Sequence, residues 1–472
     1  MKKVKELYNK IKKNIDCKDI IIFSIPFIMF GIYLVILYPG VLSYDSYNQL
    51  TQIKYMTFTS SHPFFHTFIE MVLMKIVDTP AIVGLFQITF FSVLWTRICK
   101  YNRIKHSNFD FSYQVVLTVL LGINPLNKIM SITLWKDVLY SYMVLLLSFE
   151  MEKLVDNKFK IDLKNIIKIS FILLVLPNLR HNGYLITLVI SLILFIIFLV
   201  KDIKIKGKKN FNYLKLVGFI LVFFLCFKGL NKIYNVDKGL SVTGVGSIID
   251  YKVLAVAGEI GRYGRNVTEE DHKEINKYID FYCMIQKTRF NSLDHMWVSC
   301  NSNEEEMKNN RISMYKTIFS MMLRNPGVSI KFYLKEWGFI WRIVRYKDSY
   351  GNINFYGIDS GGIWDMNYER PLLNTKPYLI VSRYMYFTRT NVFFQTLFYS
   401  GSLCLYLSIA ILVFLKKKYN VKMLLVFLPT VVNTLGIGLT ASVNDVRYYY
   451  SNFLVLYLLG AILIKYWAKN AK

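Results

Sequence analysis

The sequence predicts an all-α polytopic membrane protein with about ten transmembrane helices and a large extracytoplasmic segment of mixed or helical structure. Of the 472 residues, 54% are apolar and only 19% are charged, below the quarter that is usual in soluble proteins. The apolar residues gather in blocks of roughly 17 to 26, the length that crosses ~30 Å of hydrocarbon. Basic residues cluster beside these blocks, as they do in membrane proteins.

The apolar blocks divide the chain into three parts. The first span is expected at 20–38, because it follows a lysine-rich tail and no small-residue cleavage site comes after it. Nine further spans are expected at 79–97, 112–126, 134–150, 165–179, 182–200, 211–230, 390–415, 421–440 and 446–464. Residues 63–77 predict a further short apolar helix, either in the interface or across the membrane. We therefore expect an N-terminal transmembrane module at 1–230 with about seven spans, an extracytoplasmic domain at 231–389 and a C-terminal module at 390–472 with about three spans.

The charge distribution predicts the orientation. The chain carries 58 Lys and Arg against 31 Asp and Glu, a net charge of +27, which the positive-inside rule explains more simply than nucleic-acid binding. If the chain crosses the membrane ten times, six basic clusters lie on the same side of the membrane as the N-terminus. They lie before the first span, at 97–105, 153–168, 201–215, 416–422 and 465–472. The prediction is a multi-pass protein of the cell membrane with both termini in the cytoplasm.

The segment at 231–389 is the only part with the composition of a soluble domain. Helices are expected at 271–282 and 304–323. The aromatic and basic stretch 329–344 suits either a helix on the lipid headgroups or a core helix of the domain. Cys283 and Cys300 lie in this extracytoplasmic part, so they form either a disulfide or two free thiols.

Polar residues are concentrated in five short stretches at the predicted outer membrane boundary. Singly, each is explained as a helix cap, a turn residue or an interface aromatic. Together they favour a shared site, because ionisable groups beside apolar spans are costly unless they are paired or line a hydrated cavity. The stretches contain Tyr44, Asp45 and Tyr47, then His62, then Lys136 and Asp137, then Arg180, His181 and Asn182, and finally Asp445, Arg447 and Tyr448.

These residue types limit the chemistry of such a site. Lys136, Arg180 and Arg447 suit a phosphate or diphosphate, which Arg holds in bidentate fashion. Asp45 or Asp137 suits a general base that accepts a proton from an attacking hydroxyl. The imidazoles of His62 and His181 suit hydrogen-bond partners, metal ligands or a second base. A phosphate at the membrane boundary opposite a carboxylate points to a lipid-phosphate ligand and to transfer of the group it carries.

The organisation resembles the GT-C class of integral-membrane glycosyltransferases over most of the chain. The matching features are Asp45 in the first outer loop, the following His62-Pro63 with aromatics, and a short helix before the second span. Asp137 in the second outer loop and the large late extracytoplasmic segment also fit. Within that class, a group of poorly characterised bacterial membrane proteins is the most similar.

The resemblance implies an inverting transfer of a sugar from a polyprenyl-phosphate donor to an extracytoplasmic glycan or lipid acceptor. Asp45 would be the general base, with Asp137 orienting the acceptor or binding a metal and His62 assisting. Lys136, Arg180, His181 and Arg447 would bind the donor phosphate. The acceptor or supporting residues would be Tyr44, Tyr47, Asn182, Asp445 and Tyr448. No cofactor is expected, and a divalent metal remains an option.

Other functions are compatible with part of this pattern. A transporter or flippase for lipid-linked saccharides predicts ionisable residues near mid-span and internal repeats, whereas the charges here lie at one face. A polymerase or ligase of lipid-linked glycans shares the outer Arg and His chemistry and the large late loop. A structural anchor leaves the outer polar residues unexplained.

Overall fold

The computed structural model describes residues 16–59, 62–103, 108–204, 211–236, 245–287, 299–344, 368–419, 421–440 and 445–470. Within these ranges every regular element is a helix, and extended pairing is limited to two isolated bridges. The first half contains α2 (Cys17–Ile36), α3 (Tyr44–Tyr55), α4 (Phe64–Met74), α5 (Ala81–Asn102), α6 (Asn108–Ile123), α7 (Pro125–Ile132), α8 (Lys136–Asp156), α9 (Leu163–Leu179), α10 (Gly183–Lys204) and α11 (Asn212–Ile233).

The second half begins with a group of helices that forms a separate module, defined here as α12 to α18. It contains α12 (Val245–Tyr263), α13 (Glu269–Ile275), α14 (Phe281–Lys287), α16 (Glu304–Asn309), α17 (Arg311–Arg324) and α18 (Pro326–Glu336). The chain then returns to the bundle through α19 (Gly338–Trp341), α20 (Lys376–Thr390), α21 (Val392–Tyr399), α22 (Gly401–Tyr419), η3 (Val421–Met423), α23 (Leu424–Thr440), η4 (Val446–Tyr449) and α24 (Tyr450–Asn470).

The fold is that of an α-helical, multi-pass membrane protein. Among the described residues, five helices are long and apolar enough to cross a membrane, or up to seven if each of two bent pairs is one span. The five are 17–36, 81–102, 183–204, 212–233 and 446–467. Two more of the ten expected spans are the bent pairs. The remaining three correspond to α8, α9 and α23, which are not both long enough and apolar enough to be counted with the five.

Two expected single spans are broken helices. Residues 112–126 are the end of α6 and the start of α7, which meet at 66°, because Asn124 caps α7 and Pro125 occupies its first turn. Residues 390–415 are α21 and α22, which meet at 54° where Ser400 interrupts the helix with extended backbone. The expected segment 63–77 is α4, whose 11 residues rise ~16 Å and are too short to cross alone.

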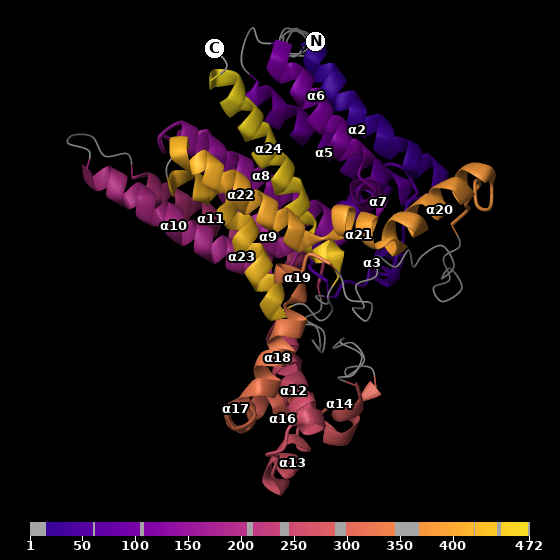
Figure 1. The fold of residues 1–472 in the computed structure, drawn as a ribbon, viewed down its shortest axis with the longest axis vertical. Coiled ribbons are helices and arrows are strands. Elements are labelled where there is room, and N and C mark those ends of the chain that lie inside the picture. The colour runs from indigo at the N-terminus through magenta and orange to yellow at the C-terminus, as the bar shows by residue number, and fades with distance from the viewer. Residues whose placement is uncertain are drawn as a thin grey trace.

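Several expected boundaries were also wrong. The helix expected at 134–150 begins at Lys136, because the backbone of Trp135 is extended, and continues to Asp156. The helices expected at 271–282 and 304–323 are each interrupted, by turns after Ile275 and at Asn310. The segment 329–344 divides into α18 and α19, and Figure 1 shows α18 rising from the module toward the bundle.

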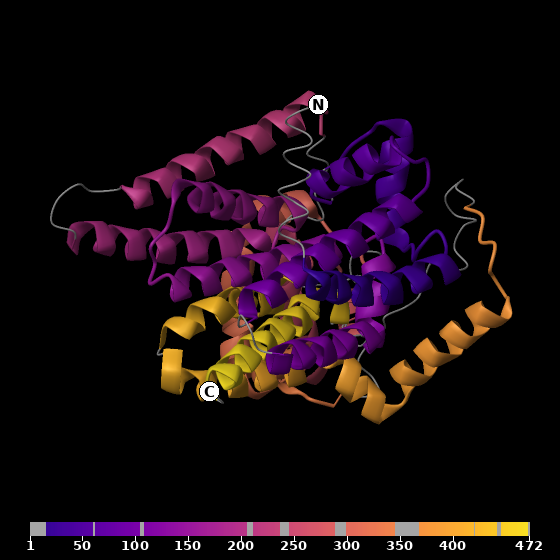
Figure 2. The same ribbon diagram turned by 90° about the horizontal axis from the view of Figure 1, so that it is seen from above.

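Helix α8 is central to the bundle. It contacts α5, α9, α23 and α24, while α2 packs against α5, α6 and α7. Seen from above, the magenta helices α10 and α11 lie at one edge of the bundle, and the orange helix α20 lies at the opposite edge (Figure 2). The side chains of α8 are therefore buried along most of its length, including polar ones near both of its ends.

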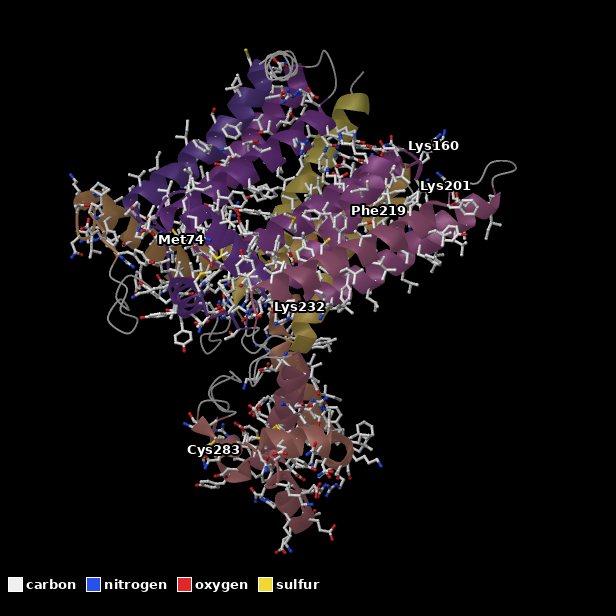
Figure 3. All side chains as sticks on the ribbon, turned by 180° about the vertical axis from the view of Figure 1, so that it is seen from behind. Met74, Lys160, Lys201, Phe219, Lys232 and Cys283 are labelled. Carbon is white, nitrogen blue, oxygen red and sulfur yellow. A yellow bond between two sulfur atoms is a disulfide. The ribbon has the colours of Figure 1, made fainter. Side chains whose placement is uncertain are left out.

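The module lies beyond one end of the bundle and has its own core. Its buried side chains include Leu254, Ile260, Phe281, Met314 and Ile318. Cys283 and Cys300 form a disulfide, which resolves the alternative of two free thiols. In Figure 3, Cys283 lies in the module.

Charged side chains mark the two ends of the bundle. At the end away from the module, Asp19 of α2 pairs with Lys100 of α5 and with Arg103, which caps that helix. Lys465 of α24 pairs there with Asp156 of α8. Figure 1 shows α2 beginning and α24 ending at that end, and Figure 3 shows Lys160 and Lys201 there. The opposite end, near the module, carries a second set of ion pairs that forms the candidate site.

Candidate functional site

The site is assembled on two loops that pair through their backbones. Val41, after α2, forms an isolated parallel bridge with Thr133, after α7. The Val41 amide donates to the Ile132 carbonyl oxygen at 3.0 Å, and the Leu134 amide donates to the Val41 carbonyl oxygen at 3.1 Å. Gly40 makes this approach possible, since its φ is +116° and a Cβ there would lie 2.8 Å from the Ile132 carbonyl oxygen.

Side chains then connect α3 to the start of α8. Ser43 caps α3 through a reciprocal pair of bonds with Ser46, and the Ser46 hydroxyl donates to the Leu134 carbonyl oxygen at 2.8 Å. The indole Nε1 of Trp135 donates to Ser43 Oγ at 2.5 Å. Asp45 in the first turn of α3 is thereby held near Lys136 in the first turn of α8.

Asp45 forms an ion pair with a residue from the far end of the chain. Arg447 Nη1 lies 2.9 Å from Asp45 Oδ2, and Arg447 Nε lies 3.4 Å from Asp445 Oδ2. The guanidinium is also 4.9 Å from the ring centroid of Trp135, and its Nη2 donates to the Tyr448 hydroxyl at 3.2 Å. The Asp45 side chain is 25% exposed and that of Arg447 is 16% exposed, so a ligand can reach both.

Asp137 and Arg180 form a second, more deeply buried pair. Arg180 Nη1 donates to Asp137 Oδ1, and the two side chains are 10% and 2% exposed, respectively. The Arg180 guanidinium also lies 4.0 Å from the centroid of the Tyr448 ring. Tyr448 therefore contacts both arginines, and it connects this pair to the Asp45–Arg447 pair.

Lys136 and His62 complete the cluster of charges. The ammonium of Lys136 donates to His62 Nδ1, which makes His62 a neutral hydrogen-bond acceptor in this arrangement. Burial and the positive charge of Lys136 lower the pKa of His62 to about 3. Burial opposes ionisation of Asp45, but the charges of Arg447 and Lys136 outweigh it and hold the pKa of Asp45 well below its ordinary value. Asp45 is therefore an anion across the physiological pH range.

The structure brings most of the twelve predicted residues together, and two tyrosines have other surroundings. Tyr47 is 2% exposed and packs in an apolar cluster with Leu42, Leu50 and Leu134. Tyr44 is 66% exposed at the start of α3. Asn182 is buried, and the turn that carries it follows Arg180 and leads into α10. His181 lies close enough to His62 for its charge to act on that imidazole.

A buried polar cluster lies close enough to Lys136 and His62 for their charges to act on it. Gln49 Nε2 donates to Thr67 Oγ1 at 2.9 Å and lies 3.1 Å from His66 Nδ1. His66 Nδ1 in turn lies 3.6 Å from Glu70 Oε2, and both side chains are fully buried. The sequence contained one sign of this pair: His66 and Glu70 are four positions apart on a predicted helix, so their side chains are expected to be neighbours. Ser43 and Trp135 had no such signal, because their partners come from distant loops.

The module reaches the site through α19. The Phe339 ring stacks on the Tyr449 ring, with centroids 4.0 Å apart and planes 21° apart. Tyr449 belongs to η4, the turn that also carries Arg447 and Tyr448. Figure 1 places α3 and α19 at the end of the bundle nearest the module. The cluster thus lies where the bundle, η4 and the module meet.

The charges define what the site can do chemically. Arg447 and Lys136 beside the partly exposed Asp45 carboxylate suit an anionic ligand with a hydroxyl partner. Among the described residues, no group of three or more His, Cys, Asp or Glu side chains could hold a metal ion. No family model, curated protein or solved structure matches this chain.

Proposed function

We propose that the protein is a GT-C-type membrane glycosyltransferase. It would transfer a sugar from a polyprenyl-phosphate donor to an extracytoplasmic glycan or lipid acceptor, with inversion at the anomeric carbon. The observation that carries this proposal is the partly exposed Asp45 carboxylate, paired with Arg447 beside the Lys136 ammonium. A carboxylate within reach of phosphate-binding cations is the arrangement that such a transfer requires.

The proposal includes ten spans, with both termini in the cytoplasm of a bacterial cell and the module outside the cell membrane. Two observations support this orientation. Helix α24 ends at the end of the bundle opposite the module (Figure 1), and the predicted inner lysines Lys160 and Lys201 lie at that same end (Figure 3). The Asp45 site would then face the outer leaflet, from which a lipid-linked sugar can enter it.

The proposed step is a single displacement. The acceptor oxygen forms a bond to the anomeric carbon while the bond from that carbon to the phosphate oxygen breaks. The hydroxyl proton passes to Asp45, and the bonding electron pair leaves with the lipid phosphate. Arg447, Lys136 and Arg180 would stabilise the negative charge that develops on the phosphate. His62, whose imidazole is neutral, would accept a hydrogen bond or orient Lys136.

Donor binding would also prepare the base. With Arg447 bound to Asp45, the carboxylate has a low proton affinity and is a weak base. A donor phosphate competes for the same guanidinium, since Arg binds phosphate in bidentate fashion. When Arg447 turns to the phosphate, the pKa of Asp45 rises toward its ordinary value, and the carboxylate becomes free to accept the acceptor proton.

Asp137 has a different role in this proposal from that of Asp45. Its carboxylate is buried and bonded to Arg180, so it would position the arginine rather than touch the acceptor. Tyr448 would keep the two arginines at a fixed spacing, because it contacts both of them. Asp445 would hold the backbone of η4, since its carboxylate accepts from the Arg447 amide at 3.0 Å.

The test is sugar transfer by the purified protein in nanodiscs. A panel of radiolabelled polyprenyl-phosphate sugars would be offered with a crude envelope acceptor, and donor binding would be measured in parallel. Transfer from one donor supports the proposal. Binding of a lipid-linked saccharide followed by its movement across the bilayer, with no new glycosidic bond, would identify a flippase. Extension of lipid-linked glycans by whole repeat units would identify a polymerase. No binding of any polyprenyl phosphate would contradict the proposal.

A further inference from the structure

An apolar groove lies between α22 and α23. Its volume is about 550 Å³, within the range of sites that hold small molecules. The lining includes Ile340 of α19, Leu412 and Lys416 of α22, and Val431 and Leu435 of α23. The groove is open at its side, since Leu435 is 46% exposed. Its walls belong to helices whose outer surfaces face lipid in a membrane protein.

The dimensions of the groove match one leaflet of a bilayer. Leu405 and Lys416 both line it, so it follows α22 for ~16 Å at 1.5 Å per residue. The hydrocarbon core of a bilayer is ~30 Å thick, so the groove is about as long as one leaflet is deep. A single acyl chain lying against α22 and α23 would fill it.

The charge in the groove is at one end only. Lys416 is the only charged residue of the lining, and it lies at the end of α22 that leads into η3. That end of the bundle also carries the Lys465–Asp156 pair, and Lys422 of η3 lies 6.0 Å from the centroid of the Phe159 ring. Lys416 is therefore at the end opposite the Asp45 site.

Among the described residues, some of the lysines at this end of the bundle are paired with carboxylates, and others are not. Lys153 and Lys168 pair with Glu150, and Lys465 pairs with Glu152 and Asp156. Within the described part of the chain, Lys416 makes no ion pair. An exposed ammonium above an apolar groove is complementary to a lipid that has an anionic headgroup and an acyl chain.

We propose that this groove binds an anionic phospholipid from the leaflet opposite the Asp45 site. The headgroup phosphate contacts Lys416, and one acyl chain lies between α22 and α23 with its end against Ile340. The next residue, Phe339, stacks on Tyr449 beside Arg447. The bound lipid therefore supports α19 and the turn that carries Arg447. This site is separate from the one that would bind the donor phosphate, and the proposal does not depend on sugar transfer.

Lipid binding to the purified, delipidated full-length protein tests the proposal. The probes are dioleoyl phosphatidylglycerol and dioleoyl phosphatidylcholine, and bound lipid is counted by native mass spectrometry. The wild type is expected to retain phosphatidylglycerol in preference to phosphatidylcholine. Lys416→Gln should weaken phosphatidylglycerol binding about fivefold, the effect of one Lys near an anionic lipid. Lys164→Gln removes an exposed charge at the start of α9 and serves as the matched control.

Two further variants fill the groove itself. Leu412→Trp and Val431→Trp place an indole on opposite walls, so that one remains informative if the other does not fold. Each should reduce binding of both phospholipids, and size-exclusion chromatography would verify that the variant is monodisperse. The proposal is overturned if Lys416→Gln and Lys164→Gln bind alike, or if a folded Trp variant binds phosphatidylglycerol as the wild type does. Loss of polyprenyl-phosphate binding alone in the Trp variants would assign the groove to the donor and would also overturn it.

Discussion

Asp45 and Arg447 are 402 positions apart in the chain, and their side chains form an ion pair with a separation of 2.9 Å between Oδ2 and Nη1. One residue comes from the first helix after α2, and the other comes from the turn before α24. The pair therefore joins the N-terminal and C-terminal transmembrane segments at the end of the bundle near the module. In the proposed mechanism, it would hold Asp45 in a state of low proton affinity until a donor phosphate competes for the guanidinium.

Replacement of Arg447 tests this competition. Arg447→Ala should lower kcat/KM for sugar transfer by roughly 10²- to 10³-fold, because it removes a group that stabilises the leaving phosphate. Arg447→Lys should restore part of the loss, since the charge remains but the bidentate contact does not. Steady-state kinetics and donor binding would be measured together. Arg383→Ala, an exposed position on α20, is the control, and equal activity in both Ala variants would contradict the role of Arg447.

The buried Asp137–Arg180 pair predicts a large effect on stability. Asp137→Ala leaves the Arg180 guanidinium without its carboxylate partner and should destabilise the protein by about 3–5 kcal/mol. The double variant Asp137→Leu with Arg180→Met should recover much of this stability but not sugar transfer. Equilibrium unfolding in mixed micelles measures the first quantity. A stable Asp137→Ala variant would show that Arg180 has another anionic partner.

The loop pairing that aligns Asp45 with Lys136 depends on Gly40. Gly40→Ala should destabilise the protein by at least ~1 kcal/mol, because φ is +116° and the new methyl group would meet the Ile132 carbonyl oxygen. Gly31→Ala, in α2, has no atom within 4 Å of the added carbon and should be neutral or slightly stabilising. Thermal unfolding compares the two. Equal melting temperatures would mean that the loop pairing contributes little.

The neutral imidazole of His62 predicts a dependence of stability on pH. The pKa of His62 is lowered to about 3, whereas an unfolded His has a pKa near 6.5. Between these values the unfolded state binds more protons, so stability falls as the pH falls. From pH 7 to pH 5 the loss attributable to His62 is about 2 kcal/mol. His62→Gln should flatten the profile by that amount, and an unchanged slope would assign the effect to other groups.

The sequence predicted the composition of the site better than its geometry. Asp45, Lys136, Arg180 and Arg447 all stand out in the sequence because ionisable groups beside apolar spans are costly and need partners. The pairing itself was not predictable, since Asp45 can pair with any of several outer cations and its actual partner is 402 positions away. The separate roles proposed for Asp45 and Asp137 rest on their difference in burial, which depends on how α8 packs among its neighbours.

The fold likewise has features that the sequence predicts and features that it does not. The helical character and the long apolar helices follow directly from the length and composition of the blocks. The break between α6 and α7 had a signal in Asn124-Pro125, an N-cap followed by proline at the first helical turn. The break between α21 and α22 had a weaker signal, because Ser400-Gly401 is also compatible with a continuous helix in a membrane. The position of α19 depends on contacts with Tyr449 and α22, which local sequence does not encode.

The most direct test of the central proposal compares Asp45→Asn with the wild type in the sugar-transfer assay. The substitution keeps the shape of the side chain but removes its ability to accept a proton. Transfer should fall by roughly 10²- to 10⁴-fold while donor binding and folding are retained. Asp78→Asn, an exposed acid in the loop before α5, should transfer sugar at the wild-type rate. Undiminished transfer by a folded Asp45→Asn protein would contradict the assignment of Asp45 as the base.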